Sequence, residues 1–294
     1  MLRFPLAAIA WAAFVASPGT GRSPLQTEVF TAGDSGYAVT STIIYGPTEA
    51  MLVDAQFTHD DAGRLADRID RLGRKLTTIF VTHPDADHFL GLGPLHQRFP
   101  DARIYMTAGG IAAYRRDVGK LIADLQRTKR GNEAPPSEPL ASALPSTRLS
   151  VDGQRVEIIP DLQGDYHGKP LNSVVWVPSR KTLIAGDMAF DRVHLWLDKS
   201  TPESRRNWRS DLRRLKRLGA KEMVAGHRRA ADAPLDAAIL DANRAYLAAF
   251  DSAVAGNRTA DAVEEQMIGS YADWAHPLFL KIAARSIYPP PKKP

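Results

Sequence analysis

The sequence predicts a layered α/β domain with mixed β-sheet pairing, followed by a helical C-terminal extension. Short β-branched and aromatic runs alternate with helical patterns through most of the chain, without a strict strand–helix–strand rhythm. From residue 234 to about residue 284 only helical periodicity remains. The composition agrees, because 44% of the 294 residues are hydrophobic and 24% are charged. Such values are typical of globular domains rather than of disordered chains or coiled coils.

Runs rich in Val, Ile, Thr and Tyr, bounded by turn residues, predict five strands in the first half of the chain. These strands are expected over residues 27–31, 37–45, 50–54, 76–81 and 103–106. The fourth run has no charged residue, which is typical of a buried strand. Apolar residues at helical spacing predict two helices between and after these strands. The helices are expected from Asp60 or Asp61 to Leu72, and over about 110–126.

The second half begins with a long expected loop over residues 129–146, which contains four prolines. Further strands are expected over residues 148–151, 155–159, 174–177, 182–185 and 222–225. Between the last two, Thr201 and Pro202 have the residue types of a helix N-cap and first helical position. The apolar stripe of this helix contains Trp208, Leu212 and Leu215.

The N-terminus resembles a secretory signal. Arg3 precedes an uncharged apolar run over residues 4–16, and small residues follow. A run of this length is too short to span a bilayer, and no later segment is apolar enough to do so. We therefore expect a signal peptide over 1–21, an exported protein that is periplasmic or secreted, and no stable membrane span after cleavage. A membrane-surface anchor or a mis-assigned start remains the alternative.

Composition also excludes several kinds of site. The chain has no cysteine, which excludes disulfides, cysteine nucleophiles, thiolate zinc sites and iron–sulfur clusters. The net charge of +5 is mild for this length. It permits nucleic-acid binding without favouring it, so we expect a small-molecule substrate and no nucleic-acid partner. The sequence leaves the oligomeric state open.

Four potential metal ligands lie close together directly after the expected buried strand. They are His83, Asp85, Asp87 and His88. A tight loop can turn alternate side chains toward one point, and Pro84 stiffens this loop. Imidazole and carboxylate donors suit zinc, manganese or iron. The alternative is an acidic, solvated loop with two incidental histidines, but such a loop rarely has this density of donors.

The segment 82–91, Thr-His-Pro-Asp-Ala-Asp-His-Phe-Leu-Gly, resembles the His-x-His-x-Asp-His signature of the metallo-β-lactamase superfamily. Three further features follow in that family's order, namely a downstream histidine at His167, a strand ending in Gly-Asp at Asp187, and a late histidine at His227. The resemblance covers about residues 29–229. It implies an α/β fold that is a four-layer αββα sandwich of two mixed β-sheets flanked by helices. We expect this domain over 24–230, a helical extension over 231–288 and a frayed tail over 289–294.

The resemblance also implies two divalent metal ions. One would bind His83, Asp85 and His167, and the other Asp87, His88 and His227, with Asp187 bridging. Asp85 departs from the family, which has histidine there, so manganese or iron becomes possible beside the first expectation of zinc. The alternative is that the first site binds its metal weakly and that the enzyme depends mainly on the metal of the second site. The family usually continues Gly-His-Thr-Pro-Gly-Ser, whereas Gly-Lys-Pro follows His167 here.

The function implied is hydrolysis, in which a metal-bound hydroxide attacks an ester, lactone, thioester or amide carbonyl, including that of a β-lactam. Asp87 would bind the second ion and orient the hydroxide. His194, Trp196 and Tyr166 are the candidates for substrate contact, and for His194 and Trp196 the favoured alternative is packing. The alternatives are a metal-dependent nuclease or phosphodiesterase, supported only by the basic helix 205–217, and a non-catalytic metal-binding protein with a degenerate site.

Overall fold

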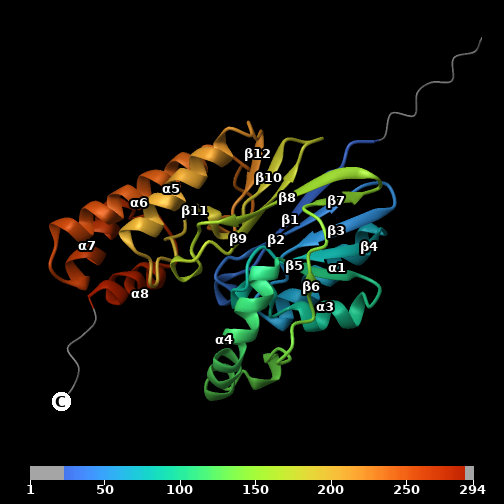
Figure 1. Cartoon of the computed structure of the whole chain (residues 1–294), viewed down its shortest axis with the longest axis horizontal. Helices are drawn as coiled ribbons and strands as arrows, with labels where there is room; N and C mark the ends of the chain where they lie inside the picture. The colour runs from blue at the N-terminus through green and yellow to red at the C-terminus, as the bar shows by residue number, and fades with distance from the viewer. Residues whose placement is uncertain (1–22, 289–294) are drawn as a thin grey trace, which may run out of the picture.

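A computed structural model describes residues 23–288, so the expected signal segment 1–21 and tail 289–294 lie outside the described residues. Two mixed β-sheets stack face to face, and helices cover the outer face of each (Figure 1). The predicted four-layer αββα sandwich is therefore confirmed. The layers form because each sheet buries one face against the other sheet and its second face under helices.

The first sheet has six strands in the order β1-β2-β3-β4-β5-β6. Its three N-terminal strands pair antiparallel, and the pairs from β3 to β6 are parallel. The strands are β1 (Gln26–Thr31), β2 (Thr40–Tyr45), β3 (Glu49–Val53), β4 (Lys75–Phe80), β5 (Arg103–Met106) and β6 (Ser142–Ala143).

The second sheet has five strands in the order β12-β10-β9-β8-β7. The β10–β12 pair is parallel, and the other pairs are antiparallel. The strands are β7 (Arg148–Val151), β8 (Gln154–Leu162), β9 (Asn172–Val177), β10 (Thr182–Ile184) and β12 (Glu222–Val224). A separate parallel pair joins β11 (Phe190–Asp191) to β13 (His227–Arg228). Short 3-10 turns cover Asp34–Gly36, Gly131–Glu133, Tyr166–Gly168 and Gly186–Met188.

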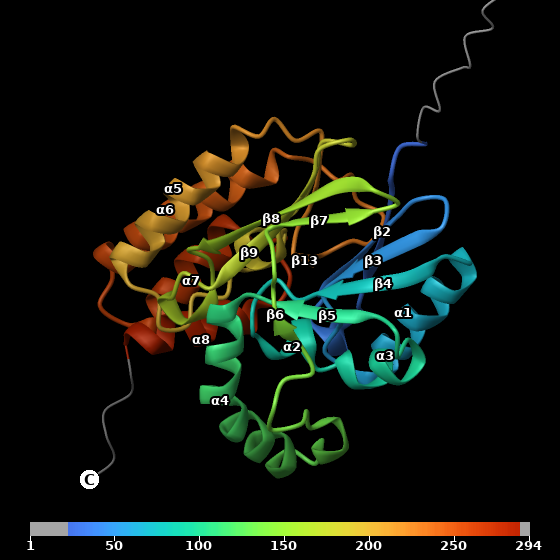
Figure 2. The ribbon, with the colours of Figure 1, turned by 45° about the vertical axis from the view of Figure 1, so that its right-hand side comes forward.

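Helices α1, α3 and α4 cover the outer face of the first sheet, and the short α2 lies in the loop after β4. Their bounds are α1 (His59–Leu72), α2 (Ala86–Phe89), α3 (Leu92–Arg98) and α4 (Ala108–Arg127). α1 begins at the N-cap Thr58, whose side chain accepts from the Asp61 amide, and ends at the left-handed Gly73. In Figure 2, α1 and α3 lie beside the sheet, while α4 extends beyond it.

The helices of the second half form one apolar core with the outer face of the second sheet. They are α5 (Pro202–Lys216), α6 (Ile239–Gly256), α7 (Ala260–Ser270) and α8 (Pro277–Ile287). Trp208 of α5, Phe250 of α6 and Phe279 of α8 belong to the same buried cluster as Trp176 of β9. The C-terminal helices therefore complete the fourth layer of the domain (Figure 1).

Three local expectations needed correction. The first helix begins at His59 rather than at Asp60 or Asp61, because the Thr58 side chain caps it. The strand expected over 37–45 begins only at Thr40, because Tyr37 and Ala38 have φ angles of 56° and 57°, outside the strand region. The expected loop 129–146 contains the two-residue strand β6, which pairs in parallel with β5. A strand of two residues forms because it pairs with β5, and its own sequence does not predict it.

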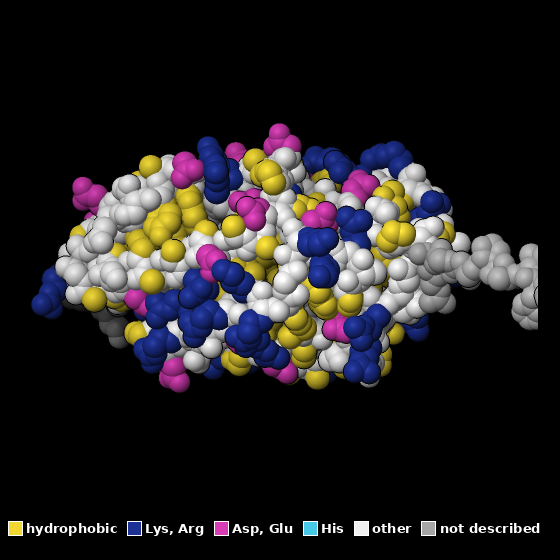
Figure 3. Space-filling model, turned by 90° about the horizontal axis from the view of Figure 1, so that it is seen from above, with side chains coloured by type: hydrophobic (Ala, Val, Ile, Leu, Met, Phe, Trp, Pro, Cys, Tyr) yellow, Lys and Arg dark blue, Asp and Glu magenta, His cyan; other side chains and the backbone are white. Residues whose placement is uncertain are grey.

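The basic character of α5 is partly neutralised by neighbouring acids. Arg209 pairs with Asp251 and Lys216 with Asp241, both on α6. Lys and Arg side chains gather on one face of the molecule, with Asp and Glu among them (Figure 3).

Within residues 23–288, none of the helices has the length and apolar content that a membrane span requires.

Candidate metal centre

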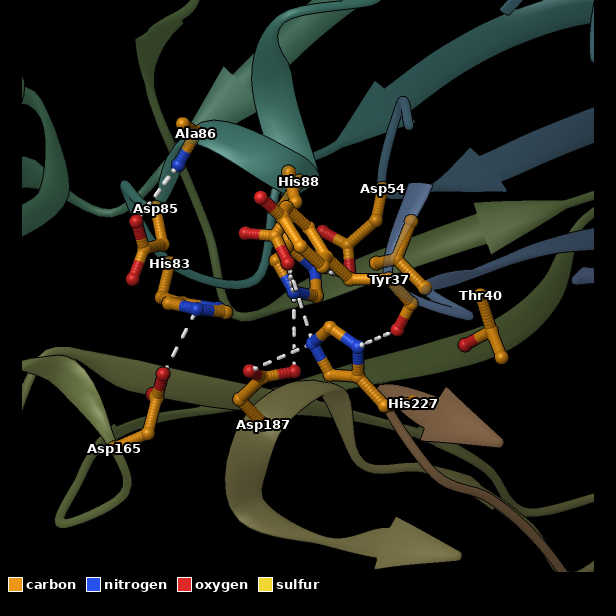
Figure 4. Close-up of polar contacts among 12 residues, drawn as sticks. Tyr37, Thr40, Asp54, His83, Asp85, Ala86, His88, Asp165, Asp187 and His227 are labelled. Carbon is orange, nitrogen blue, oxygen red and sulfur yellow. Dashed lines mark hydrogen bonds and ion pairs between the residues drawn. The ribbon is translucent and has the colours of Figure 1, made fainter. Parts of the chain in front are cut away.

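The centre is assembled at the ends of strands from both sheets (Figure 4). Asp54 follows β3 and His83 lies just after β4, its parallel neighbour. Asp187 follows β10 and His227 begins β13, shortly after β12. Because parallel neighbours end at the same edge of a sheet, these segments bring their side chains to one place.

The loop after β4 turns at Asp85, which is the N-cap of the single-turn helix α2. The Asp85 carboxylate accepts a hydrogen bond of 2.9 Å from the Ala86 amide. The turn that follows carries Asp87 and His88 into the centre, where the His88 ring lies 4.3 Å from the His83 ring, centroid to centroid. The donor-rich loop is therefore folded around one point.

Gly186 precedes Asp187, and Gly226 precedes His227. Neighbouring groups lie so close to the backbone at both glycines that a side chain would not fit. A Cβ at Gly226 would lie 2.0 Å from the Asp187 Oδ1 atom. A Cβ at Gly186 would lie 2.7 Å from the Thr82 Oγ1 atom, and the residue has a φ of 48°. Side chains at either position would displace the groups that form the centre.

Three groups of donor side chains each have their ligand atoms within 4.8 Å of one another. The groups are His83, His88 and Asp187; Asp87, His88 and His227; and His83, Asp85 and Asp165. Asp187 lies between two histidines, with its oxygens 3.0 Å from the His88 Nε2 and 3.2 Å from the His227 Nε2. This is the position expected of a bridging carboxylate.

The structure does not bring His167 into any of these groups. Its Nδ1 atom lies 3.5 Å from the Asp198 carboxylate, and its side chain is 33% exposed. The buried Asp165 faces the centre instead, with its Oδ1 atom 3.7 Å from the His83 Nε2. Asn172 holds that oxygen with a hydrogen bond of 2.8 Å. Asp165, which follows Gly164, was not among the donors expected from the sequence.

The electrostatics of the centre favour a cation. Burial and then the carboxylates of Asp187 and Asp85 raise the pKa of Asp165 well above its usual range. Burial and then Asp87 raise the pKa of Asp85 to about 6. Like charges crowded in a low-dielectric site are costly unless a positive charge lies among them.

The histidines also fit a site for a cation. Against the effect of its burial, the carboxylate of Asp187 raises the pKa of His227 to about 10, a positive charge that a bound metal would replace. Burial, and then the charge of His88, lowers the pKa of His83 to about 4, so its ring is neutral near pH 7. The His83 Nε2 atom is buried and has no hydrogen-bond partner. The Nδ1 of His227 lies 2.7 Å from the Tyr37 carbonyl, an arrangement that directs its Nε2 toward the carboxylates. The residues present therefore fit divalent ions with nitrogen and oxygen ligands.

Asp54, the last residue of the strand expected over 50–54, contacts both Thr82 and His88. Its Oδ1 accepts from the Thr82 amide at 2.8 Å, and its Oδ2 lies 2.9 Å from the His88 Nδ1. The Asp54 carboxylate pairs with one ring nitrogen of His88, and the other ring nitrogen lies 3.0 Å from Asp187 in the centre.

We expect Asp54→Asn to weaken metal binding by about 10- to 100-fold, because the amide is a poorer acceptor for the His88 ring. Competition with a chelator measures the dissociation constant. Asp60→Asn, at an exposed position of α1, makes the same change of charge outside the centre and should leave the constant unaltered. Equal constants for the wild type and both variants would contradict the role of Asp54.

The three residues proposed for substrate contact have different surroundings. Trp196 lines a pocket of about 160 Å³ over the centre. The Tyr166 hydroxyl donates to Asp117 at 2.9 Å, and its ring borders a neighbouring depression. His194 is buried, with its Nδ1 atom 2.8 Å from the Tyr246 hydroxyl. This placement fits the packing role of His194, the favoured of the two alternatives.

The buried His194 should make stability depend on pH. Burial, and then the charge of His276, lowers its pKa to about 4, whereas an unfolded histidine titrates near 6.5. The unfolded state therefore binds more protons between these values, and stability falls as the pH falls through them. Between pH 7 and pH 4.5 the free energy of unfolding should fall in both proteins. We expect the fall to be about 2 kcal/mol smaller for His194→Gln than for the wild type, as measured by denaturant unfolding. The exposed His96→Gln is the control, and an equal pH dependence for all three proteins would contradict the prediction.

Comparison with known proteins agrees with the fold. The family model described as the metallo-beta-lactamase superfamily matches residues 34–227. A solved metallo-beta-lactamase family protein from Thermus thermophilus has a TM-score of 0.62 and 20% identity, covering 89% of this chain and 91% of that chain. For the DIM-1 metallo-beta-lactamase the TM-score is 0.52 at 20% identity, with 77% and 98% covered. These likenesses concern the fold.

One curated relative is a coenzyme F420H(2) oxidase from Methanocaldococcus jannaschii. It is 29% identical over 96 residues, which is 29% of this chain. The match spans only 23% of the relative's own length.

Proposed function

Because this chain belongs to the metallo-beta-lactamase superfamily, we propose that it is an exported metal-dependent hydrolase of esters, lactones, thioesters or amides. The observation that carries the proposal is the buried His83 Nε2, unpartnered and facing carboxylates, beside Asp187 between two histidines. The apolar N-terminal segment supports export, and N-terminal sequencing of the mature protein tests it.

The proposed ligand set replaces His167 by Asp165. One ion would be held by His83, Asp85 and Asp165, and the other by Asp87, His88 and His227, with Asp187 between them. The first set has two carboxylates, so manganese or iron competes with zinc there. When bound, such ions acidify water and polarise a carbonyl oxygen.

The protein side chains orient the reaction around this set. Asp87 lines the pocket over the centre, and its Oδ2 lies 3.2 Å from the His227 Nε2. A carboxylate in this position can orient an attacking water and accept its proton. Phe190 stacks on the His227 ring with centroids 5.1 Å apart, which keeps the imidazole in one orientation.

The test combines metal content with a substrate panel. Elemental mass spectrometry should find about two metal equivalents per chain. A carbonyl substrate should be hydrolysed, the activity should disappear with a chelator and return with metal, and Asp187→Ala should be inactive. Cleavage of phosphodiesters alone would replace this proposal by the nuclease alternative. Two bound metals without turnover of any carbonyl substrate would favour the binding-protein alternative.

A further inference from the structure

The pocket over the centre has one polar side and one apolar side. Its floor contains the carboxylates of Asp85, Asp87, Asp165 and Asp187 with His227. The apolar side comes from distant parts of the chain, chiefly the loops before β2 and after β3 and the C-terminal helix α8. The apolar residues are Tyr37, Phe57, Trp196, Leu278, Phe279 and Ile282.

Phe279 fixes α8 against the centre. Its ring meets the His227 ring edge to face at 5.7 Å and the Trp196 ring at 5.2 Å, centroid to centroid. It is 5% exposed, whereas the preceding Leu278 is 51% exposed. Leu278 lines the pocket and is half exposed, so a substitution there changes the pocket wall without disturbing the packed core.

The pocket lining offers no cationic side chain to an anionic ligand group. None of its lining residues within the described part of the chain is Lys or Arg. The exposed Lys120 borders the neighbouring depression beside Tyr166 and His167. The four floor carboxylates balance the charge of two divalent ions, so no surplus positive charge remains for a substrate carboxylate.

We propose that this pocket takes the apolar acyl part of a neutral substrate, and that α8 is its specificity-determining wall. The inference rests on the proposed hydrolase function and narrows its substrate class. The pocket volume of about 160 Å³ is close to that of an engineered cavity of about 150 Å³ that holds benzene. One phenyl ring or a short alkyl chain therefore fits, and an ester or lactone without a carboxylate is favoured over a β-lactam, which carries one.

The first test measures kcat/KM for 4-nitrophenyl acetate, butyrate, hexanoate and hemisuccinate with the metal-loaded protein. We expect the hexanoate to exceed the acetate by at least about tenfold, because each buried methylene adds favourable transfer energy. The hemisuccinate should fall at least about tenfold below the butyrate, because its carboxylate has no cationic partner. Equal values across the series would overturn the inference while leaving the hydrolase proposal intact.

Two substitutions at the exposed Leu278 test the wall with little risk to folding. Leu278→Ala should lower the ratio of hexanoate to acetate turnover severalfold. Leu278→Lys should raise the ratio of hemisuccinate to butyrate turnover at least about fivefold, since it supplies the missing cation. Ile268 on α7 is similarly exposed but does not line the pocket, so Ile268→Ala and Ile268→Lys are the matched controls.

A binding readout separates this inference from the hydrolase proposal. In methyl-labelled protein, neutral hexanamide should shift the Ile282 δ1-methyl resonance and leave that of Ile268 in place, whereas succinamate should shift neither. A protein that shows these shifts but hydrolyses no ester would keep the pocket inference and lose the proposed reaction. An Ile282 resonance that does not respond to hexanamide would overturn the inference, whatever the protein hydrolyses.

Discussion

Replacing Asp165 with Asn should remove about one metal equivalent per chain and lower kcat/KM at least about 100-fold. The carboxylate is buried and faces His83, and the neutral amide contributes less charge to a site built for a cation. His167→Gln should leave metal content unchanged and activity within about tenfold, because that ring faces Asp198. Elemental mass spectrometry and steady-state kinetics on the two variants decide between the ligand assignments.

The exposed Asp161→Asn is a matched control for the change of charge, and it should behave as the wild type. Its residue has a φ of 58°, which Asn tolerates as well as Asp does. The opposite pattern, with metal retained in Asp165→Asn and lost in His167→Gln, would restore His167 as the ligand.

Asp251→Asn should lower the free energy of unfolding by about 3 kcal/mol, because it leaves a buried guanidinium without its counter-charge. Arg205 is 1% exposed, and its Nε atom donates to the Asp251 Oδ1 at 2.6 Å. The other oxygen of Asp251 accepts from Arg209 at 2.9 Å. The substitution weakens both of the contacts that Asp251 makes with α5. The melting temperature should fall by about 6 °C or more.

Asp241→Asn on the same helix is the control, since Asp241 pairs with the exposed Lys216. An exposed ion pair contributes little, so the loss should stay below about 1 kcal/mol. The free energy of unfolding of Asp251→Asn could instead fall no more than that of the control. That result would contradict the prediction and show that water or the hydrogen bonds to Ser200 stabilise the Arg205 charge.

Local sequence predicted the regular elements well where neighbouring residues decide them. The strands β5 and β7 have the predicted bounds, and α5 begins with Thr201 as N-cap and Pro202 as its first residue. Thr201 and Ser204 complete a capping box there. The two-residue strands β6, β11 and β13 were missed because each exists only through pairing with a distant segment.

The same distinction applies to the centre. The donor types and their order along the chain identified the loop of His83 to His88, with Asp187 and His227. The spacing of residues along the sequence does not show which side chain of the segment 165–167 faces the metal centre. It depends on the backbone of His167, with φ at 44°, and on the hydrogen bond from Asn172 to Asp165.

The sequence by itself determined the fold class, the elements and the set of chemical groups available to a metal, because these depend on residue type and on neighbours within a few positions. The tertiary structure decided that Asp165 faces His83, that Asp54 orients His88, and that α8 covers the pocket. Helical periodicity shows that one face of α8 is apolar, but not what lies against it. That outcome is fixed by the packing of segments far apart in the chain, whose relative positions no local pattern contains.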